Sequence, residues 1–465
     1  MIKKLLYASL LFYGFLFLIA CSSPKALSDI AKSDYVEEPV SPYYTNPKSD
    51  LVFSFKISKS SMSDSLDIIL DSLLIGTTDL EDSGVTLALS RVDSSKVKMV
   101  GRGLSIDVPL NVVLFKTTML GTLTAAGKIN MKFESDLDID RNWNLISYTT
   151  LDDHEWIEKP KFRAGIFSIP ITSLTDAVID RTKNFLTRGI DESLKQNFSL
   201  REYVDDVTDV LLTPYKLDST FGGWIYMMAD NAYLAPAEDE SDYSCSKFYA
   251  PMYMKVQSTY PYDINNDNIA PPIFAWNNNI PDSTQFRVRV DMRYDYLTSL
   301  AKDKFLNQTF KNGDKEIKIE DLIVFGQDNL LKVACKTSGS FNGNVIIGGI
   351  PVYENNILQA KNLDLDIKTK NVFHKTGSFL AKGFIRNQLN KMLYFDITDY
   401  LQQAKDEIEV KLSELKESKN ITVNVGWGEI DINSIQIKEN KLDGLMEAKL
   451  KVDIVIDDLK KLSSF

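Results

Sequence analysis

Lys-Ile-Asn-Met-Lys-Phe-Glu-Ser-Asp-Leu-Asp-Ile-Asp, residues 128–140, alternates apolar and polar side chains almost throughout. In an extended chain Ile129, Met131 and Phe133 point to one side, and the intervening lysines, asparagine and acids mostly point to the other. This period of two is typical of an antiparallel strand that has one dry and one wet face. The sequence around this segment therefore predicts a sheet whose apolar face must be covered.

The same alternation recurs in residues 104–114, 286–292 and 446–456. These strands would be about a dozen residues long, where five or six is usual. Helices are fewer. A capping box at Ser61-Met62-Ser63-Asp64 predicts one helix, and similar signals predict helices that open at Ser173 and Ser199. Two more are expected between residues 379 and 415. The fold class predicted is α+β.

Short segments recur in the same order in the two halves of the chain. Phe185-Leu186-Thr187-Arg188-Gly189 corresponds to Phe379-Leu380-Ala381-Lys382-Gly383, and residues 198–204 correspond to residues 395–401. A turn-rich cluster at residues 277–282 separates the halves. We therefore predict two similar halves, each a long curved antiparallel sheet wrapped around helices. Their bounds are 51–280 and 281–465.

The composition excludes several classes of protein. The chain has 465 residues, of which 44% are apolar and 25% charged, and this is globular composition. The net charge of −11 argues against a nucleic-acid binder, which needs a basic face. Two histidines and three cysteines argue against a multi-histidine zinc site and against a disulfide scaffold. No metal or other cofactor is predicted.

The first residues indicate where the protein resides. Lys3 and Lys4 precede an apolar stretch from Leu5 to Ala20, which is short for a membrane span. It closes in Leu18-Ile19-Ala20-Cys21, which resembles the lipobox of bacterial lipoproteins. That resemblance implies a signal peptide over residues 1–20 and acyl chains, palmitate among them, on Cys21.

Residues 21–50 are rich in proline, serine and charge, and we interpret them as a flexible tether. The predicted location is the outer membrane, to which the lipidated Cys21 would attach the protein. No run of acids follows Cys21 directly, because Asp29 is the first acid. The periplasmic face is therefore favoured over the cell surface.

Larger motifs give a second resemblance. Asn142-Trp143 at a strand end, Trp156-Ile157-Glu158-Lys159-Pro160 and the two Phe-Leu-x-basic-Gly segments follow the lipobox in order. In this order and length the chain resembles the Domain of Unknown Function 4403 family of bacterial lipoproteins, over roughly residues 50–460. That family is similar in outline to the tubular lipid-binding superfamily, which includes the bactericidal permeability-increasing proteins. The resemblance implies a curved sheet around a helix and an apolar tube for acyl chains. It transfers no catalytic residues.

The residues and the resemblance together predict a non-enzymatic envelope protein that binds or carries a lipid-like ligand in an elongated cavity. Long one-faced strands leave more dry surface than few helices can easily cover, and acyl chains could fill the remainder. A fully packed core is the alternative. The residues predicted to line the cavity are Leu104, Ile106, Val108, Leu110, Val112 and Leu114 in the first half, and Val345, Ile347, Ile350 and Val352 in the second.

Two other functions remain as alternatives. Aromatic residues are dense between Tyr215 and Trp276, and exposed rings could stack on sugars, so a glycan-binding or purely structural protein is the first alternative. Ser299-Leu300-Ala301-Lys302, Ser340-Phe341-Asn342 and Lys375-Thr376-Gly377 match the motifs of a penicillin-recognising serine acyltransferase. The three motifs lie close together in sequence and strand-like sequence separates the first two, which disfavours this second alternative.

The remaining candidate motifs, histidines and cysteines are weaker evidence for a function. Asp138, Asp140, Asn142 and Asn144 resemble the start of a calcium loop, but Trp143 stands where such a loop needs glycine. His154 lies among carboxylates with no nucleophile near it in sequence, and His374 has no suggestive neighbours. Cys245 and Cys335 could pair across the halves. Two free thiols are favoured.

Overall fold

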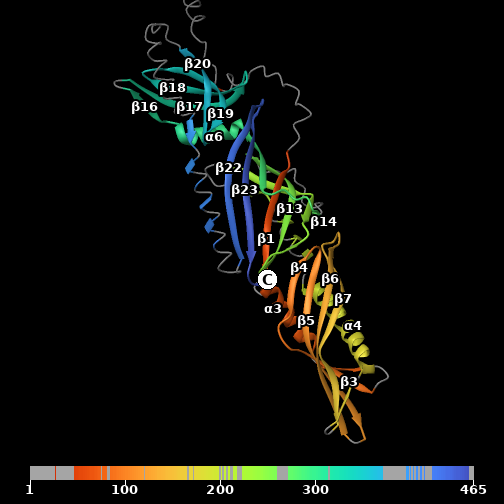
Figure 1. Cartoon of the computed structure of the whole chain (residues 1–465). Coiled ribbons are helices and arrows are strands. Elements are labelled where there is room, and N and C mark those ends of the chain that lie inside the picture. The colour runs from red at the N-terminus through yellow and green to blue at the C-terminus, as the bar shows by residue number, and fades with distance from the viewer. Residues whose placement is uncertain are drawn as a thin grey trace, which may run out of the picture.

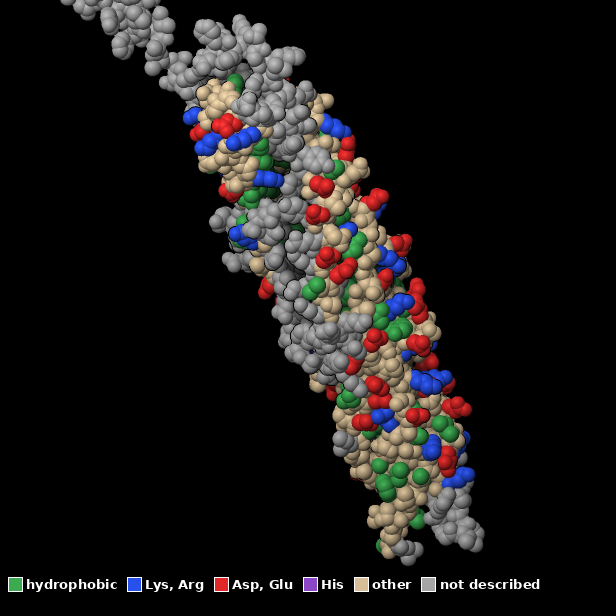
Figure 2. Space-filling model, turned by 90° about the vertical axis from the view of Figure 1, so that its left-hand side faces the viewer, with side chains coloured by type: hydrophobic (Ala, Val, Ile, Leu, Met, Phe, Trp, Pro, Cys, Tyr) green, Lys and Arg blue, Asp and Glu red, His purple; other side chains and the backbone are tan. Residues whose placement is uncertain are grey.

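The computed structural model describes residue 27 and residues 47–459, apart from a set of gaps. The gaps are 75, 81–83, 120, 165–166, 171, 198–199, 202–203, 206–207, 210–212, 217–222, 259–270, 313–314, 370–393, 397, 400–401, 403–404, 407–408, 411–412 and 414–420. The molecule is elongated, and three β-sheets follow one another along its length (Figure 1). Figure 2 shows acidic and basic side chains interspersed along one face of the rod. None of the helices in the described ranges is long and apolar enough to cross a bilayer.

A seven-stranded antiparallel sheet, the first sheet, forms one end of the rod. Its strands pair in the order β2-β3-β5-β6-β7-β8, and β4 also pairs with β5. Three of them are 16, 19 and 20 residues long, so the long strands are confirmed, but they exceed the predicted length of about a dozen residues. The strands are β2 (Thr77–Leu80), β3 (Val85–Arg91), β4 (Lys96–Val100), β5 (Gly103–Thr118), β6 (Gly121–Ile139), β7 (Leu145–Ala164) and β8 (Phe167–Pro170).

Two helices cover the inner face of the first sheet: α3 (Lys59–Leu73) and α4 (Thr172–Asn197). Both were predicted, but α3 begins earlier than its capping box suggested. Its N-cap is Ser58, whose hydroxyl oxygen accepts a hydrogen bond from the Ser61 amide at 3.5 Å. The Ser61 hydroxyl oxygen accepts from the Leu459 amide instead, at 2.7 Å. The Ser61 side chain, which was expected to cap the helix, therefore binds a residue far away in the sequence instead.

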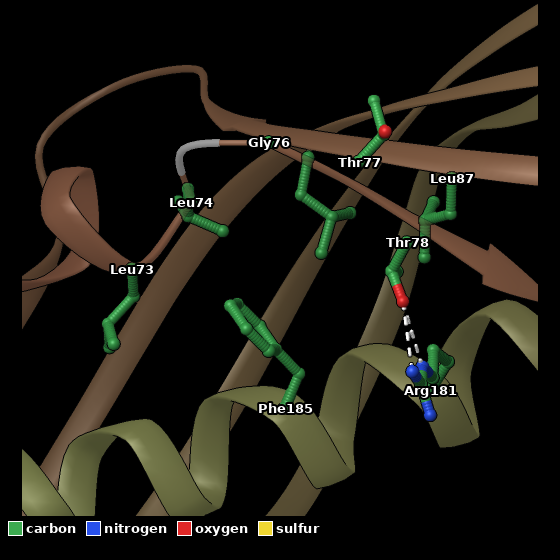
Figure 3. A pocket seen from close by; sticks show the side chains of 9 residues that line it. Leu73, Leu74, Gly76, Thr77, Thr78, Leu87, Arg181 and Phe185 are labelled. Carbon is green, nitrogen blue, oxygen red and sulfur yellow. Dashed lines mark hydrogen bonds between the residues drawn. The ribbon is translucent and has the colours of Figure 1, made fainter.

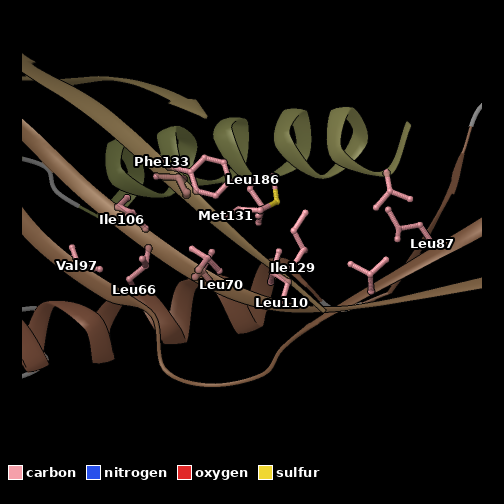
Figure 4. Close-up of a cluster of buried hydrophobic side chains, with 14 of the residues drawn as sticks. Leu66, Leu70, Leu87, Val97, Ile106, Leu110, Ile129, Met131, Phe133 and Leu186 are labelled. Atoms are coloured by element: carbon pink, nitrogen blue, oxygen red, sulfur yellow. The ribbon is translucent and has the colours of Figure 1, made fainter. Parts of the chain in front are cut away.

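The inner face and the two helices share one continuous apolar core (Figure 4). Phe133 and Met131 of β6 are fully buried, together with Leu70 of α3 and Leu186 of α4. The polar residues of β6 alternate with them and face solvent, so the burial pattern repeats the sequence pattern. Fully burying one such side chain contributes roughly 1.5–3 kcal/mol, and this core is the main source of stability at this end of the rod.

A ten-stranded central sheet lies in the middle. Its main path runs β14-β11-β13-β1-β15-β23-β22, so strands from both ends of the chain lie side by side. Most pairs are antiparallel, but β1 with β23, β13 with β15 and β11 with β14 are parallel. The strands are β1 (Ser49–Ser58), β9 (Tyr215–Lys216), β10 (Trp224–Ala229), β11 (Asn231–Leu234), β12 (Glu238–Asp239), β13 (Tyr243–Gln257), β14 (Ile273–Trp276), β15 (Thr284–Arg293), β22 (Ile421–Ile437) and β23 (Lys441–Ile456).

One face of the central sheet carries a set of paired charges. Arg289 of β15 contacts Asp443 of β23 through two guanidinium nitrogens, at 3.1 and 2.5 Å, and the Asp443 side chain is fully buried. Beside this pair, Asp291 accepts from Lys441 at 2.6 Å. Arg287 contacts Asp50 of β1 at 2.9 Å. The charges therefore connect three strands that are far apart in sequence.

A six-stranded antiparallel sheet forms the other end. One described helix, α6 (Tyr294–Phe305), packs against it, mainly on β17. Its buried residues divide into small clusters instead of one core among the described residues. The strands, in pairing order, are β16 (Thr309–Asn312), β17 (Lys315–Gln327), β18 (Leu330–Gly339), β19 (Gly343–Glu354), β20 (Ile357–Thr369) and β21 (Tyr394–Asp396).

The predicted α+β class is confirmed in part: the protein is mostly β, with curved antiparallel sheets and few helices among the described residues. The predicted boundary at residue 280 falls between β14 and β15, which belong to the same central sheet. Similarity of the two halves stays a prediction, as do their bounds. The signal peptide, Cys21 and the helices expected between 379 and 415 lie wholly or mostly outside the described residues.

Candidate functional site

A small pocket opens where α3, the β2–β3 hairpin and α4 meet (Figure 3). Its cavity volume is about 80 Å³, and it is partly open to solvent. Leucines supply most of its apolar wall. The nine lining residues are Leu73, Leu74, Gly76, Thr77, Thr78, Leu87, Leu89, Arg181 and Phe185.

The wall on the side of α3 and the hairpin follows from local sequence. Helix α3 ends at Leu73, and Leu74 is its C-cap, so two leucines stand at the point where the chain turns. Gly76 has a φ of +117°, a conformation open to glycine but costly for other residues, and the chain turns there into β2. Leu87 and Leu89 lie two residues apart on β3 and therefore face the same side.

The wall on the side of α4 comes from the Phe-Leu-x-basic-Gly motif. Phe185 lines the pocket with its side chain 39% exposed, whereas Leu186 points into the core and is fully buried. Gly189 allows the two helices to approach, because a Cβ there would lie 2.7 Å from Cδ1 of Leu73. The motif singled out in the sequence thus positions both α4 and the pocket's aromatic ring.

Polar contacts tie the hairpin to both helices, at the pocket and beside it. Arg181 of α4 donates from Nε and Nη2 to the Thr78 hydroxyl oxygen, at 3.2 and 2.9 Å (Figure 3). Arg91 of β3 donates to both carboxylate oxygens of Asp71 on α3, at 2.7 Å each. Hydrogen bonding to Arg91 lowers the pKa of the Asp71 carboxyl, which therefore stays ionised at neutral pH. The hairpin is thus tied to both helices by hydrogen bonds from arginine.

The pocket is continuous with the apolar core. Leu87 is fully buried, and Leu73, Leu74 and Leu89 pack against the core cluster. Across the β3–β5 pairing Leu87 lies opposite Leu114, and Leu89 lies opposite Val112. Two of the predicted lining residues are therefore direct neighbours of the wall of the pocket.

The other predicted lining residues lie deeper or elsewhere. Leu104 is half-buried at the margin of the core, while Ile106, Val108, Leu110, Val112 and Leu114 are at most 1% exposed within it. Val345 and Ile347 are buried in a small cluster of the six-stranded sheet. Val352 is half-buried, and Ile350 is 41% exposed. None of the ten lines the pocket described above, and their part in ligand binding stays a prediction.

Sequence reasoning named none of the nine lining residues as ligand-binding, although Phe185 belongs to the repeated motif. A usable signal was present for two of them, because Arg181 and Phe185 are four residues apart and so share one face of α4. No signal was present for the rest, since only the fold brings the end of α3 next to the β2–β3 hairpin.

A family model described as "Domain of unknown function (DUF4403)" matches residues 47–456. The chain belongs to this family. The resemblance read from the motifs is thereby confirmed. No curated protein matches the chain. Among solved structures it is similar to one described as "Crystal structure of lipopolysaccharide binding protein", with 10% identity and a TM-score of 0.31, over 89% of this chain and 100% of that chain.

The first two of the three acyltransferase-like motifs of this DUF4403 protein make hydrogen bonds and an ion pair with nearby helix and strand residues. The Ser299 hydroxyl donates to the Tyr296 carbonyl oxygen at 2.7 Å, and Lys302 pairs with Asp321 at 2.8 Å. The Ser340 hydroxyl oxygen accepts from the Glu316 amide. Residues 375–377, the last of the three acyltransferase motifs, lie outside the described residues. Both described motifs thus make contacts that fit helix and strand structure.

The residues that resembled a calcium loop form a tight turn. The Asp140 carboxylate accepts from the amides of Asn142 and Asn144, at 2.8 and 2.9 Å, and from the Asn144 side chain at 3.0 Å. These hydrogen bonds lower the pKa of Asp140. Trp143 takes a φ of 61° within the turn. Across the described ranges no group of three or more potential ligands could hold a metal ion.

The remaining titratable candidates are separate from the pocket. His154 is exposed on β7, and His374 lies outside the described residues. Cys245 and Cys335 are free thiols. Burial, with a hydrogen bond to Glu240, raises the pKa of Cys245 to about 11, and burial raises that of Cys335 to about 12.

Several of the described aromatic residues between Tyr215 and Trp276 pack within or between sheets. Tyr233 stacks on Tyr249 across neighbouring strands, with ring centroids 5.5 Å apart. Phe274 forms edge contacts with Trp276 and with Trp143, which lies at the β6–β7 turn of the first sheet. Trp143 also donates from its indole nitrogen to the Pro272 carbonyl oxygen at 2.7 Å. These rings therefore help to join the first and central sheets.

Proposed function

We propose that this DUF4403 protein binds a lipid-like ligand, with the end of an apolar chain seated in the pocket between α3, α4 and the β2–β3 hairpin. The supporting observation is that the leucines of the core reach the surface here, beside the half-exposed ring of Phe185. Each methylene group that leaves water for such a site gains about 0.8 kcal/mol. A ligand with an alkyl chain gains most from a pocket of this composition.

A longer chain would extend from the pocket towards Val112 and Leu114, which lie opposite its leucines. The interior there is filled by side chains of the protein itself, so the elongated cavity would form as the ligand enters. The hairpin is the element best placed to move. Its hydrogen bonds to the helices, Arg181 with Thr78 and Arg91 with Asp71, each join one exposed side chain to a partly buried one.

We also propose that the folded part acts without catalysis at the periplasmic face of the outer membrane, held there by acyl chains on Cys21. The support is the lipobox-like sequence Leu18-Ile19-Ala20-Cys21 and the tether-like composition of residues 21–50. Loss of fatty-acid labelling in a Cys21→Ser variant, and its release into the soluble fraction, would test the anchor separately from ligand binding.

Binding is tested with protein that lacks residues 1–21. The probe is the neutral dye N-phenyl-1-naphthylamine, whose fluorescence emission rises in an apolar site. The Leu74→Trp variant should fill the pocket and weaken binding about tenfold, which corresponds to about 1.4 kcal/mol. Ile146→Trp is the matched control, because Ile146 is 50% exposed and lies outside the pocket. Equal affinity of the Leu74→Trp and control proteins would refute this site.

A further inference from the structure

We infer that the six-stranded sheet is the end of the rod that faces the membrane, and that the docking of Leu27 on this sheet sets the orientation. The inference rests on the anchor at Cys21 in the proposed function. It deepens that function, because it says which surface of the protein meets the bilayer and where the candidate pocket lies relative to it.

The first argument is the burial of Leu27. It is the one residue before position 47 that the structure describes, and it is only 9% exposed. It shares an apolar cluster with Phe325 of β17, Ala334 of β18 and Ile346 of β19, which are also buried. Removing a leucine side chain from water favours the docked state by about tenfold or more. The chain that follows Cys21 is therefore held on the six-stranded sheet at Leu27.

The second argument is the face of the sheet on which this cluster lies. Leu322 of β17 lies opposite Cys335 of β18, and Ile323 lies opposite Ala334. Neighbouring residues of a strand point to opposite faces of the sheet. Leu322 and Cys335 pack against α6, so Ile323 and Ala334 point to the other face, together with Leu27. Leu27 thus covers apolar side chains that α6 does not reach.

The third argument is the short reach of the chain between Leu27 and the anchor. Leu27 follows Cys21 by six residues, which span at most about 20 Å even when fully extended. By comparison, β23 of the central sheet and β5 of the first sheet have 16 residues each, and each strand spans roughly 50 Å. Acyl chains on Cys21 would therefore enter the bilayer beside the six-stranded sheet, and not beside the first sheet.

This orientation places the pocket on the far side of the molecule. The six-stranded sheet and the first sheet lie at opposite ends of the rod, with the central sheet between them (Figure 1). The pocket between α3, α4 and the β2–β3 hairpin belongs to the first sheet. It is therefore held further from the anchoring bilayer than the six-stranded sheet is, where a ligand or a partner that is not part of that bilayer can reach it.

The orientation is tested with the full-length, lipidated protein in vesicles of phosphatidylethanolamine and phosphatidylglycerol that contain a lipid-linked acceptor dye. The Cys245→Ser background is used, and Cys335 is 1% exposed. A donor dye is attached at one exposed position on each sheet, through Lys311→Cys, Asp282→Cys or Met119→Cys.

Energy transfer to the bilayer should decrease from the six-stranded sheet to the first sheet. Lys311→Cys lies on β16, Asp282→Cys lies just before β15, and Met119→Cys lies at the tip of the β5–β6 hairpin. Transfer should be strongest from the first of these positions and weakest from the last. The difference between these two should be about threefold or more, because strands of both other sheets separate them.

Variants assign the orientation to Leu27. Leu27→Asp should leave the apolar cluster, so that transfer from the three positions differs by less than about twofold. Leu27→Met keeps an apolar side chain of similar volume and should behave as the wild type. Ile350→Asp is the matched control, because Ile350 is an exposed apolar residue of β19 outside the cluster, and it should also behave as the wild type.

Trypsin gives a second readout that does not depend on dyes. Lys25 and Lys32 lie on either side of Leu27 in the sequence, and cleavage there releases the folded part from the vesicles. Docking should slow this cleavage, because a protease acts on the undocked fraction of the chain. Release should be about tenfold faster in Leu27→Asp than in the wild type, and unchanged in Leu27→Met and Ile350→Asp.

The outcomes separate the inference from the proposed function. Equal transfer from the three positions, or the strongest transfer from Met119→Cys, in protein that is bound to the vesicles, overturns the inference and leaves the anchor in place. An order that persists in Leu27→Asp, or release that is no faster in this variant, also overturns it. Wild-type protein that binds the vesicles no better than Cys21→Ser refutes the proposed anchor, and the inference with it.

Discussion

The first sheet and the central sheet stabilise their strands in different ways. In the first sheet consecutive strands pair, and one apolar core between the sheet and two helices holds them. In the central sheet β1, β15 and β23 come from distant parts of the chain, and paired charges connect them on one face. An apolar core tolerates many arrangements of similar side chains, whereas a buried ion pair is satisfied in one register only. The charges are therefore placed where short connections cannot fix the register.

The largest loss of stability is expected when the buried ion pair between Arg289 and Asp443 is broken. Arg289→Met leaves the carboxylate of Asp443 buried without its guanidinium partner, and it should lower the free energy of unfolding by about 3–5 kcal/mol. Urea titration followed by circular dichroism measures this. Adding Asp443→Leu to Arg289→Met should recover most of the loss. A double variant as unstable as the single one would show that the charge left behind is not the cause.

The next effect is expected in the core of the first sheet. Leu110→Ala removes a fully buried side chain and should cost about 2–5 kcal/mol in the same titration. Ile146→Ala, on a half-exposed residue of the same sheet, should stay within about 0.5 kcal/mol. If both variants lost the same stability, the sheet would not have the one-sided core described above.

A larger side chain distinguishes a packed core from a cavity. Val108→Phe adds volume at a fully buried position, and in a packed core it should cost about 1–3 kcal/mol through overpacking. Calorimetry of the ligand-free protein gives this value. An unchanged unfolding temperature, with a loss of lipid binding, would instead show that Val108 faces space that a ligand fills.

The smallest effect concerns the joint between the two sheets. Lys59 and Lys98 both pair with Asp239 of β12 and lower the pKa of its carboxyl. Because the pKa of Asp239 is lower in the folded protein, its ion pairs contribute their full stabilisation when the pH is above the ordinary pKa of an aspartate. This stabilisation is lost as the pH falls through the lowered pKa. Hydrogen exchange near Ala237, expressed relative to the intrinsic rate at each pH, should therefore become faster below about pH 4. Asp239→Asn should show that faster exchange already at neutral pH.

Much of the first sheet could be predicted from sequence because its signals are local. The alternation around Met131 and Phe133 marked β6 and its buried face, and the spacing of Val178, Leu186 and Ile190 matches the buried face of α4. The Phe-Leu-x-basic-Gly motif also proved informative, because Phe185 and Gly189 shape the candidate site.

The central sheet could not be predicted in this way. The alternation in residues 286–292 and 446–456 predicts two strands, but their partners, such as Thr284 with Leu450, follow only from the whole fold. The same holds for the pocket, where Leu73 and Thr78 meet Phe185 only after α4 has packed. Core and ligand-facing residues also look alike in sequence, since both are apolar at strand spacing. That is why the lining residues named in advance lie mostly in the core.

The place of β23 in the sheet affects when the protein can finish folding. This strand follows all the other described strands in the sequence, yet it lies between β15 and β22 and pairs in parallel with β1, the first of them. The first sheet has all its strands long before that, so it can form while the remainder of the chain is still emerging. The central sheet cannot be completed until residues 441–456 have been synthesised, and during that interval the edges of β1 and β15 are open to incorrect partners. A polypeptide that ends before residue 441 would contain all the strands of the first sheet, but its central sheet would lack β23.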